Sequence, residues 1–199
     1  AREWPWAGRR AEADFNRALA AMIQDSDNDA TSYVIDVLSQ TTSGPELDGE
    51  ELEEYLRRRS QIDAYAASQF GGSLRLANKT FEFGPYGRES QLRAVGSNFC
   101  TPAQAVRCLQ SFFATSDGGE LLQRVTGEGN GQADRFIGAA LPPGTRLWSK
   151  AGWTSRVRHD VARFEVDGAV WDLAIFTEGA SDDEALIGRI AGQILFKRR

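Results

Sequence analysis

The sequence predicts an α+β protein in which a mostly helical part precedes an antiparallel sheet closed by a C-terminal helix. Two observations support this class. Apolar residues recur with helical spacing over much of residues 11–70, and three strand-like segments follow one another after residue 141. We therefore expect a mostly helical domain over residues 1–140 and the C-terminal part of an α/β domain over residues 141–199.

Three helices are expected in the first third of the chain. Residues 11–24 and 26–40 each place apolar side chains on one stripe, and Ser26 or Asp27 suits the N-cap of the second helix. Residues 50–70 run from acidic to basic, as the helix dipole favours, with ion pairs possible four residues apart. We interpret this charged run as a solvated helix face.

A turn-rich stretch follows and leads to a fourth helix. Residues 71–98 contain FGGS and FGPYGRES, and both segments are typical of turns. The next helix is expected to begin at Pro102, because proline is favoured at the first helical position.

Three strands and a helix are expected at the C-terminal end. The strands are LWSKAGW, VRHDVARFEV and AVWDLAIFTEG, and Asp167-Gly168 between the last two indicates a two-residue hairpin. The SDDE segment at 181–184 predicts a capping box for a final helix over residues 182–197. Three apolar residues of this helix are expected to face inward: Leu186, Ile190 and Ile194.

Composition excludes several kinds of partner. The net charge of −5 argues against nucleic acid as the main partner, and no apolar run reaches the ~18 residues of a membrane span. With one histidine and two cysteines in the chain, a zinc site is not expected. We expect neither a metal nor a cofactor.

Two short motifs bear on chemistry. The segment Ser26-Asp27-Asn28 opens a predicted helix, where three small polar residues commonly serve as a cap. The segment SKAGWTS, which includes Lys150 and Gly152, lies on a predicted strand well downstream. Together the two motifs correspond to the S-D-N and K-T-G elements that serine hydrolases of the penicillin-recognising type combine with a nucleophilic S-x-x-K.

Over most of residues 15–199 the chain resembles the class A β-lactamase-like serine hydrolases. The segments that carry the resemblance are MIQDSDNDATSYVIDVLS, GPYGRESQ, NFCTPAQAVRCL and LPPGTRLWSKAGWTSRVRHDVARFEVDG. It implies a β-lactamase/transpeptidase-like fold with the active site between a helical domain and a sheet. It also implies catalytic roles for Ser26 as a proton relay, Asn28 as a donor to the substrate amide, and Lys150 as a fixed positive charge.

Three departures from the family pattern stand out. No S-x-x-K occurs in the sequence, so the nucleophile is expected in an upstream segment of a longer protein, and the fragment alone is expected to be inactive. Ala151 replaces the threonine of K-T-G, which removes a hydroxyl worth about 1.5–3 kcal/mol as a charge-assisted hydrogen bond. The E-x-x-L-N of the β-lactamase Ω-loop is also absent.

Further residues are candidates for the site on this reading. Glu89 could act as a general base if it is buried, or it could pair with a neighbouring arginine. Substrate-binding candidates cluster on and after the predicted strand that carries Lys150: Ala151, Gly152, Trp153, Thr154 and Arg158.

A triad of Ser155, His159 and Asp160 is not expected. Successive side chains on a strand point to opposite faces of the sheet, so His159 and Asp160 cannot orient one another. We expect a structural role for His159.

The function expected from the resemblance is a β-lactamase or DD-peptidase type of serine hydrolase. Its substrate would be an amide or ester, either a small β-lactam-like molecule or a peptidoglycan-like peptide, and the protein would be periplasmic or secreted. The alternative is a non-catalytic, penicillin-binding-like module that holds a ligand or partner without turnover. The missing N-terminal segment would itself be a partner of the chain.

Overall fold

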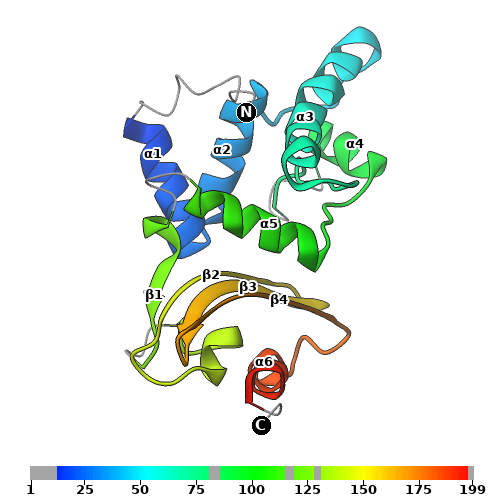
Figure 1. Cartoon of the computed structure of the whole chain (residues 1–199). Helices are drawn as coiled ribbons and strands as arrows, with labels where there is room; N and C mark the ends of the chain where they lie inside the picture. The colour runs from blue at the N-terminus through cyan, green and yellow to red at the C-terminus, as the bar shows by residue number, and fades with distance from the viewer. Residues whose placement is uncertain (1–12, 81–85, 115–118, 128–130, 197–199) are drawn as a thin grey trace. The chain divides into compact units, whose positions relative to one another are not determined.

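The computed structural model describes residues 13–80, 86–114, 119–127 and 131–196. The chain divides into two compact units, Ala1–Cys100 and Thr101–Arg199. Figure 1 shows helices in the first unit and a sheet with helices in the second. This confirms the α+β class.

The first unit contains four α-helices and a π-helical turn among its described residues. Their bounds are α1 Ala13–Ala20, η2 (π) Ala21–Asp25, α2 Asn28–Ser39, α3 Gly49–Phe70 and α4 Gly87–Val95. The three helices expected before residue 71 are confirmed. Helix α4 falls in the stretch that we interpreted as turns, so that interpretation was wrong. The inward side of α4 consists of Glu89 and Leu92, which form no apolar stripe for the periodicity to reveal.

The second unit is built on a four-stranded antiparallel sheet with the order β1-β2-β3-β4. Its elements are α5 Pro102–Phe113, η3 Glu120–Leu122, β1 Gln123–Val125, η4 Phe136–Ala140, β2 Arg146–Trp153, β3 Val157–Val166, β4 Ala169–Glu178 and α6 Leu186–Phe196. The three expected strands are confirmed as β2, β3 and β4. Strand β1 pairs with β2 and was not expected, because three residues are too few to show alternation.

Helices cover both faces of this sheet, as Figure 1 shows with α5 above it and α6 below. On one face, Leu147, Ala162 and Phe164 are fully buried in a core that includes Ile137 of η4 and Ile187 of α6. On the other face, helix α5 contacts β3 and β4. Helix α5 packs on the sheet, and the second unit accordingly begins at Thr101. We expected the boundary along the chain at residue 140.

The turn between β3 and β4 forms as expected. Asp167 and Gly168 have φ values of 54° and 72°, so both central residues are left-handed, as a type I′ hairpin requires. The helix at Pro102 is confirmed too, and Thr101 forms a capping box with Gln104.

Helix α6 begins later than expected. The expected capping box at residues 181–184 was wrong, because Ser181 donates its hydroxyl to the carbonyl of Ser155. The helix begins at Leu186, after the Asp183 carboxylate has accepted the N–H of Ala185. Its buried residues are Ile187 and Ala191, whereas Ile194, expected to face inward, is exposed.

Two glycines of α6 offer a matched test of how closely this helix packs. A Cβ atom at Gly188 would lie 3.0 Å from the Ala139 Cβ and 3.1 Å from the Phe136 carbonyl oxygen. A Cβ atom at Gly192 would meet only the Ala140 Cβ, at 3.9 Å. Alanine adds about 1 kcal/mol of helix propensity at either position, but overpacking costs about 1–3 kcal/mol at the first.

We therefore predict that Gly192→Ala raises the free energy of unfolding by up to about 1 kcal/mol, while Gly188→Ala lowers it. Urea denaturation of both variants measures the two changes. Equal changes of the same sign would contradict the close contact between α6 and η4.

Candidate active site

The S-D-N segment lies where helix α2 begins, within the first unit. Ser26 follows the π-helical turn η2 with φ 58° and ψ 35°, a left-handed conformation that is uncommon for serine. Asp27 is the N-cap, and its carboxylate accepts the N–H of Ala30 at 2.6 Å. Asn28 is the first helical residue and is exposed. The segment therefore caps α2, and Asn28 stands at the exposed end of the helix.

The K-A-G segment lies in strand β2 of the second unit. Lys150 is half-buried, and its Nζ donates to the carbonyl oxygen of Ala151 at 2.9 Å. Burial and the Arg124 guanidinium lower the pKa of Lys150, whereas the Asp160 carboxylate acts in the opposite direction. The lysine is thus a partly desolvated cation on the second strand of the sheet.

The residues after Lys150 alternate between the two faces of the sheet. Ala151 is buried in the core opposite Asp160, so a threonine here would direct its hydroxyl into that core. Gly152 is exposed, and a Cβ atom built there meets no described atom within 4 Å. Trp153 is 52% exposed and packs against the Phe136 ring at a centroid distance of 5.6 Å. Of these three residues, Gly152 and Trp153 are open to solvent.

The structure brings Arg158 next to Trp153, since the two are direct partners across β2 and β3. Arg158 is only 9% exposed, and its guanidinium donates to the Ser181 carbonyl and, at 3.2 Å, to Glu184. Thr154 has a turn role, because its hydroxyl accepts the N–H groups of Arg156 and Val157. Both candidates for substrate contact are therefore engaged within the protein.

Asp160 had no expected role once the triad with Ser155 and His159 was rejected, but the structure buries its carboxyl. Its side chain is 2% exposed, and Oδ2 accepts the N–H of Ile137 at 3.0 Å. Within the described residues, Oδ1 has no hydrogen-bond partner. Burial raises the pKa of Asp160 from its usual 3.8 to about 6, although Lys150 and Arg124 act to lower it.

His159 lies on the opposite face of β3 from Asp160. Its ring stacks on Phe176 at 4.3 Å, and its Nδ1 lies 2.7 Å from the Arg158 carbonyl oxygen. The burial of β3 alternates strictly from Val157 to Phe164, which agrees with the opposite directions expected for His159 and Asp160.

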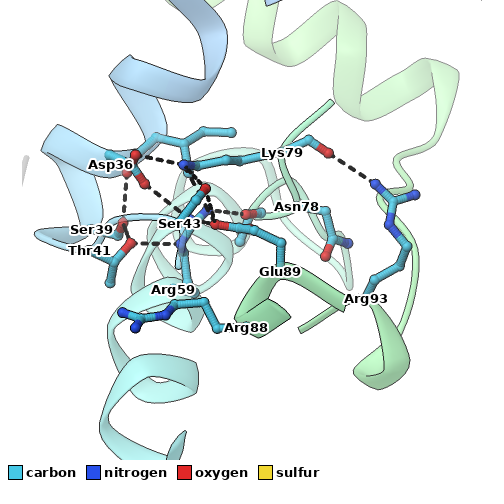
Figure 2. A network of polar contacts seen from close by, with 12 residues as sticks. Asp36, Ser39, Thr41, Ser43, Arg59, Asn78, Lys79, Arg88, Glu89 and Arg93 are labelled. Carbon is cyan, nitrogen blue, oxygen red and sulfur yellow. Dashed lines mark hydrogen bonds and ion pairs between the residues drawn. The ribbon is translucent and has the colours of Figure 1, made fainter. Parts of the chain in front are cut away.

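A buried ion network joins several elements of the first unit, and Figure 2 shows it from close by. Arg59 is 0% exposed; its Nη2 donates to Asp36 at 3.1 Å and to Glu89 at 2.6 Å. Lys79 Nζ donates to Asp36 at 2.6 Å and to Ser43 at 2.7 Å. The Ser43 hydroxyl donates to Glu89 at 3.0 Å. We call Asp36, Ser43, Arg59, Lys79 and Glu89 the Arg59 network.

The network contains two cations and two carboxylates, so its formal charges balance. Lys79 Nζ also lies 3.5 Å from Glu89, and the side chains of Arg59, Lys79 and Glu89 are at most 2% exposed. Burial raises the pKa of Asp36, opposed mainly by its hydrogen bond to Lys79. Removing one of the four charged side chains would leave a charge in the network without its partner, at a cost of about 3–5 kcal/mol.

Glu89 combines the two properties that we weighed, since it is buried and paired with an arginine. The partner is Arg59, from helix α3, and not an arginine beside it in sequence. Arg59 also binds Asp36, which lies eight residues after Asn28 on α2, about 12 Å along the helix axis. Through Arg59, Glu89 is thus linked to the C-terminal half of α2, whereas the S-D-N segment lies at the N-terminal end of that helix. The role of Glu89 as a general base stays a prediction.

Arg59 corrects the interpretation of residues 50–70 as a solvated face. Arg57 and Arg58 do lie on the surface and pair with Glu54, but Arg59 is fully buried. The signal was present in the sequence. The buried residues of α3 are Tyr55, Arg59, Ile62 and Ala66, a helical spacing with an arginine at one of its apolar positions.

No group of three metal-ligating side chains occurs among the described residues. Helices long and apolar enough to cross a membrane are likewise not found in the described part of the chain.

Comparisons with known proteins agree with this fold. A β-lactamase from Sphaerobacter thermophilus DSM 20745 matches 90% of the chain with a TM-score of 0.60 and 21% identity. PBP-A matches 93% of it with a TM-score of 0.54 and 15% identity. The chain spans 61% and 62% of the lengths of these two structures. No curated protein sequence matches the chain.

The fold is therefore that of the β-lactamase and PBP-A structures. The family model for the Beta-lactamase enzyme family matches residues 9–197, and the chain belongs to that family.

The buried carboxyl of Asp160 gives a pH-dependent prediction. Because its pKa is raised on folding, its contribution favours the folded state below pH 3.8 and is lost as the pH rises through about 6. Relative to Asp160→Asn, the wild-type protein should lose about 3 kcal/mol of unfolding free energy between pH 3.5 and 7.5.

Denaturant titrations of both proteins across that range measure the difference. Asp172→Asn is the control: Arg163 lowers the pKa of Asp172, so its stabilisation is present above pH 3.8 and is lost as the pH falls. Parallel pH profiles for wild type and Asp160→Asn would show that the carboxyl does not titrate differently on folding.

Proposed function

We propose that the chain is part of a serine hydrolase of the β-lactamase or DD-peptidase type, which cleaves an amide or ester through an acyl-enzyme. The observation that supports this most is the family match over residues 9–197, together with S-D-N at the start of α2 and K-A-G in β2. The nucleophilic serine would come from an upstream segment, since the chain contains no S-x-x-K. On this proposal the chain is inactive alone.

The proposed roles follow from chemistry and placement. Ser26 would relay a proton to the leaving nitrogen, and Asn28, exposed at the start of α2, would donate to the substrate amide carbonyl. Lys150 would supply a fixed positive charge, which has most effect where water is scarce. We propose Gly152, which is exposed on the same face of β2 as Lys150, as part of the substrate-binding surface, and Trp153 as an exposed contact at the end of the strand.

The substrate proposed is a β-lactam or a peptidoglycan-like peptide. Ala151 has no hydroxyl and its side chain lies in the core opposite Asp160, and Thr154 and Arg158 are engaged in the turn and with Glu184. We therefore propose weak recognition of a substrate carboxylate. We also propose slow turnover, because the E-x-x-L-N segment is absent, and a periplasmic or secreted location, as the family resemblance implies. Glu89, paired with Arg59, is not required as the base in this scheme.

The test is covalent labelling of the full-length protein with a fluorescent penicillin or a fluorophosphonate, read by intact mass. Lys150→Ala should reduce labelling by about 100-fold or more, while its melting temperature stays nearly unchanged. Arg146→Ala is a matched control, because it removes another cation of the same strand, one that stacks over Trp148. It should label like the wild type.

Two results would count against the proposal. A full-length protein that carries S-x-x-K and forms no adduct would exclude the acyl-enzyme. A full-length reading frame without S-x-x-K would instead support the alternative, a module that binds its ligand without turnover.

A further inference from the structure

Helix α2 has different anchors at its two ends. At its N-terminal end, Ser26 has a left-handed backbone conformation and Asn28 is exposed to solvent. The anchor at this end is local: the Asp27 carboxylate accepts the N–H of Ala30. Its C-terminal half carries Asp36, whose two carboxylate oxygens bind Arg59 and Lys79. These two cations come from helix α3 and from the segment before α4.

The Arg59 network holds this end of α2 at a second point. The N–H of Thr41 donates to the Asp36 carbonyl, and the Thr41 hydroxyl accepts from Arg59 Nε at 2.8 Å. Ser39, the last residue of α2, has its hydroxyl 2.7 Å from that of Thr41. Arg59 therefore donates hydrogen bonds both to the last turn of α2, at Asp36, and to the chain that follows the helix, at Thr41.

Apolar side chains also pack at this end, among them Val34 and Ile35 of α2. The buried cluster between α2 and α3 consists of Ile35, Ile62 and Ala77, with Leu38 packed against it. Apolar packing is non-directional, whereas hydrogen bonds to both oxygens of the partly buried Asp36 carboxylate fix a rotation and a distance. The network is thus the contact that sets the position of α2 along its own axis.

A left-handed serine also needs such support. Sparsely populated backbone conformations cost free energy and persist where the surrounding structure determines them. Ser26 stands between η2, which packs against α1, and α2, which the network anchors. A helix free to shift by a fraction of a turn would release the conformation of Ser26.

We propose that Asp36, Arg59 and Lys79 are positioning residues that hold α2 so that Ser26 and Asn28 keep the arrangement required at the proposed active site. The inference rests on the proposed function for its catalytic meaning, but the mechanical part concerns α2 alone. None of the three residues contacts the reacting groups in this scheme.

The first experiment needs no activity. It compares Asp36→Asn with Asp63→Asn, measuring amide hydrogen exchange and backbone amide chemical shifts of the full chain by NMR. Asp63 is a matched control: it is a half-buried aspartate of α3 that accepts the N–H groups of Leu76 and Ala77, outside the network.

Asp36→Asn should accelerate exchange of α2 amides on the order of 100-fold and shift the amide signals of Ser26 and Asn28. Asp63→Asn should leave residues 26–31 unchanged. Equal effects of the two variants, or no effect of Asp36→Asn at Ser26 and Asn28, would overturn the proposal.

Two further variants keep the test decisive if Asp36→Asn does not fold. Asp36→Glu retains the charge but displaces it by one methylene, so a smaller change at the same amides is expected. Lys79→Met removes the cation but keeps a side chain of similar length, so it should also accelerate exchange of the α2 amides. Wild-type exchange patterns in both Asp36→Glu and Lys79→Met would contradict the proposed anchor.

The second experiment measures acylation of the full-length protein by a penicillin. Asp36→Asn should lower the acylation rate constant at saturation by about 10- to 100-fold, with a smaller change in the binding constant. A merely destabilised enzyme would contain fewer active molecules, but each of them would keep the wild-type acylation rate constant. If the wild type is not acylated at all, the proposed function fails, while the exchange experiment still decides on the anchor.

Discussion

A guanidinium buried as completely as that of Arg59 is costly unless acceptors surround it, and the first unit is arranged to supply them. A carboxylate comes from α2, a second from α4, a hydroxyl from the loop after α2, and a carbonyl from Ala77. Lys79 then requires the same two carboxylates and the Ser43 hydroxyl. Hydrogen bonds and ion pairs thereby link α2, α3 and α4 to one another.

The second unit, by contrast, is held together mainly by apolar packing. Its sheet has one face in a core with η4 and α6, and the other face under α5. The buried carboxyl of Asp160 accepts the N–H of Ile137, in the first turn of η4. The same strand pair carries Lys150, so a candidate catalytic cation lies within the electrostatic influence of a group that belongs to the core.

Sequence patterns predicted the elements whose cause is local. The Asp27 cap, the helix at Pro102 and the Asp167-Gly168 hairpin each depend on a few neighbouring residues, and all three are confirmed. Helix α4 could not be predicted in this way, because its buried side includes Glu89, whose place depends on Arg59 thirty residues away. The late start of α6 has a similar origin, since Ser181 is bound to Ser155.

The candidate site was predictable only in part for the same reason. The S-D-N and K-A-G segments are contiguous motifs and can be recognised by inspection. The Arg59 network joins residues from five separate segments, and the burial of Arg59 contradicts its appearance in a run of arginines. Only a buried stripe with four- and three-residue spacing, in which an arginine replaces an apolar residue, could have indicated it.

The burial of the Arg59 network has a consequence for ionic strength. Ion pairs on the surface, such as Arg189 with Asp183, weaken as added salt shortens the Debye length to about 3 Å at 1 M. Arg59, Lys79 and Glu89 are almost inaccessible to mobile ions, so their attraction is little screened. The first unit should therefore keep its internal geometry in dilute and in concentrated saline alike.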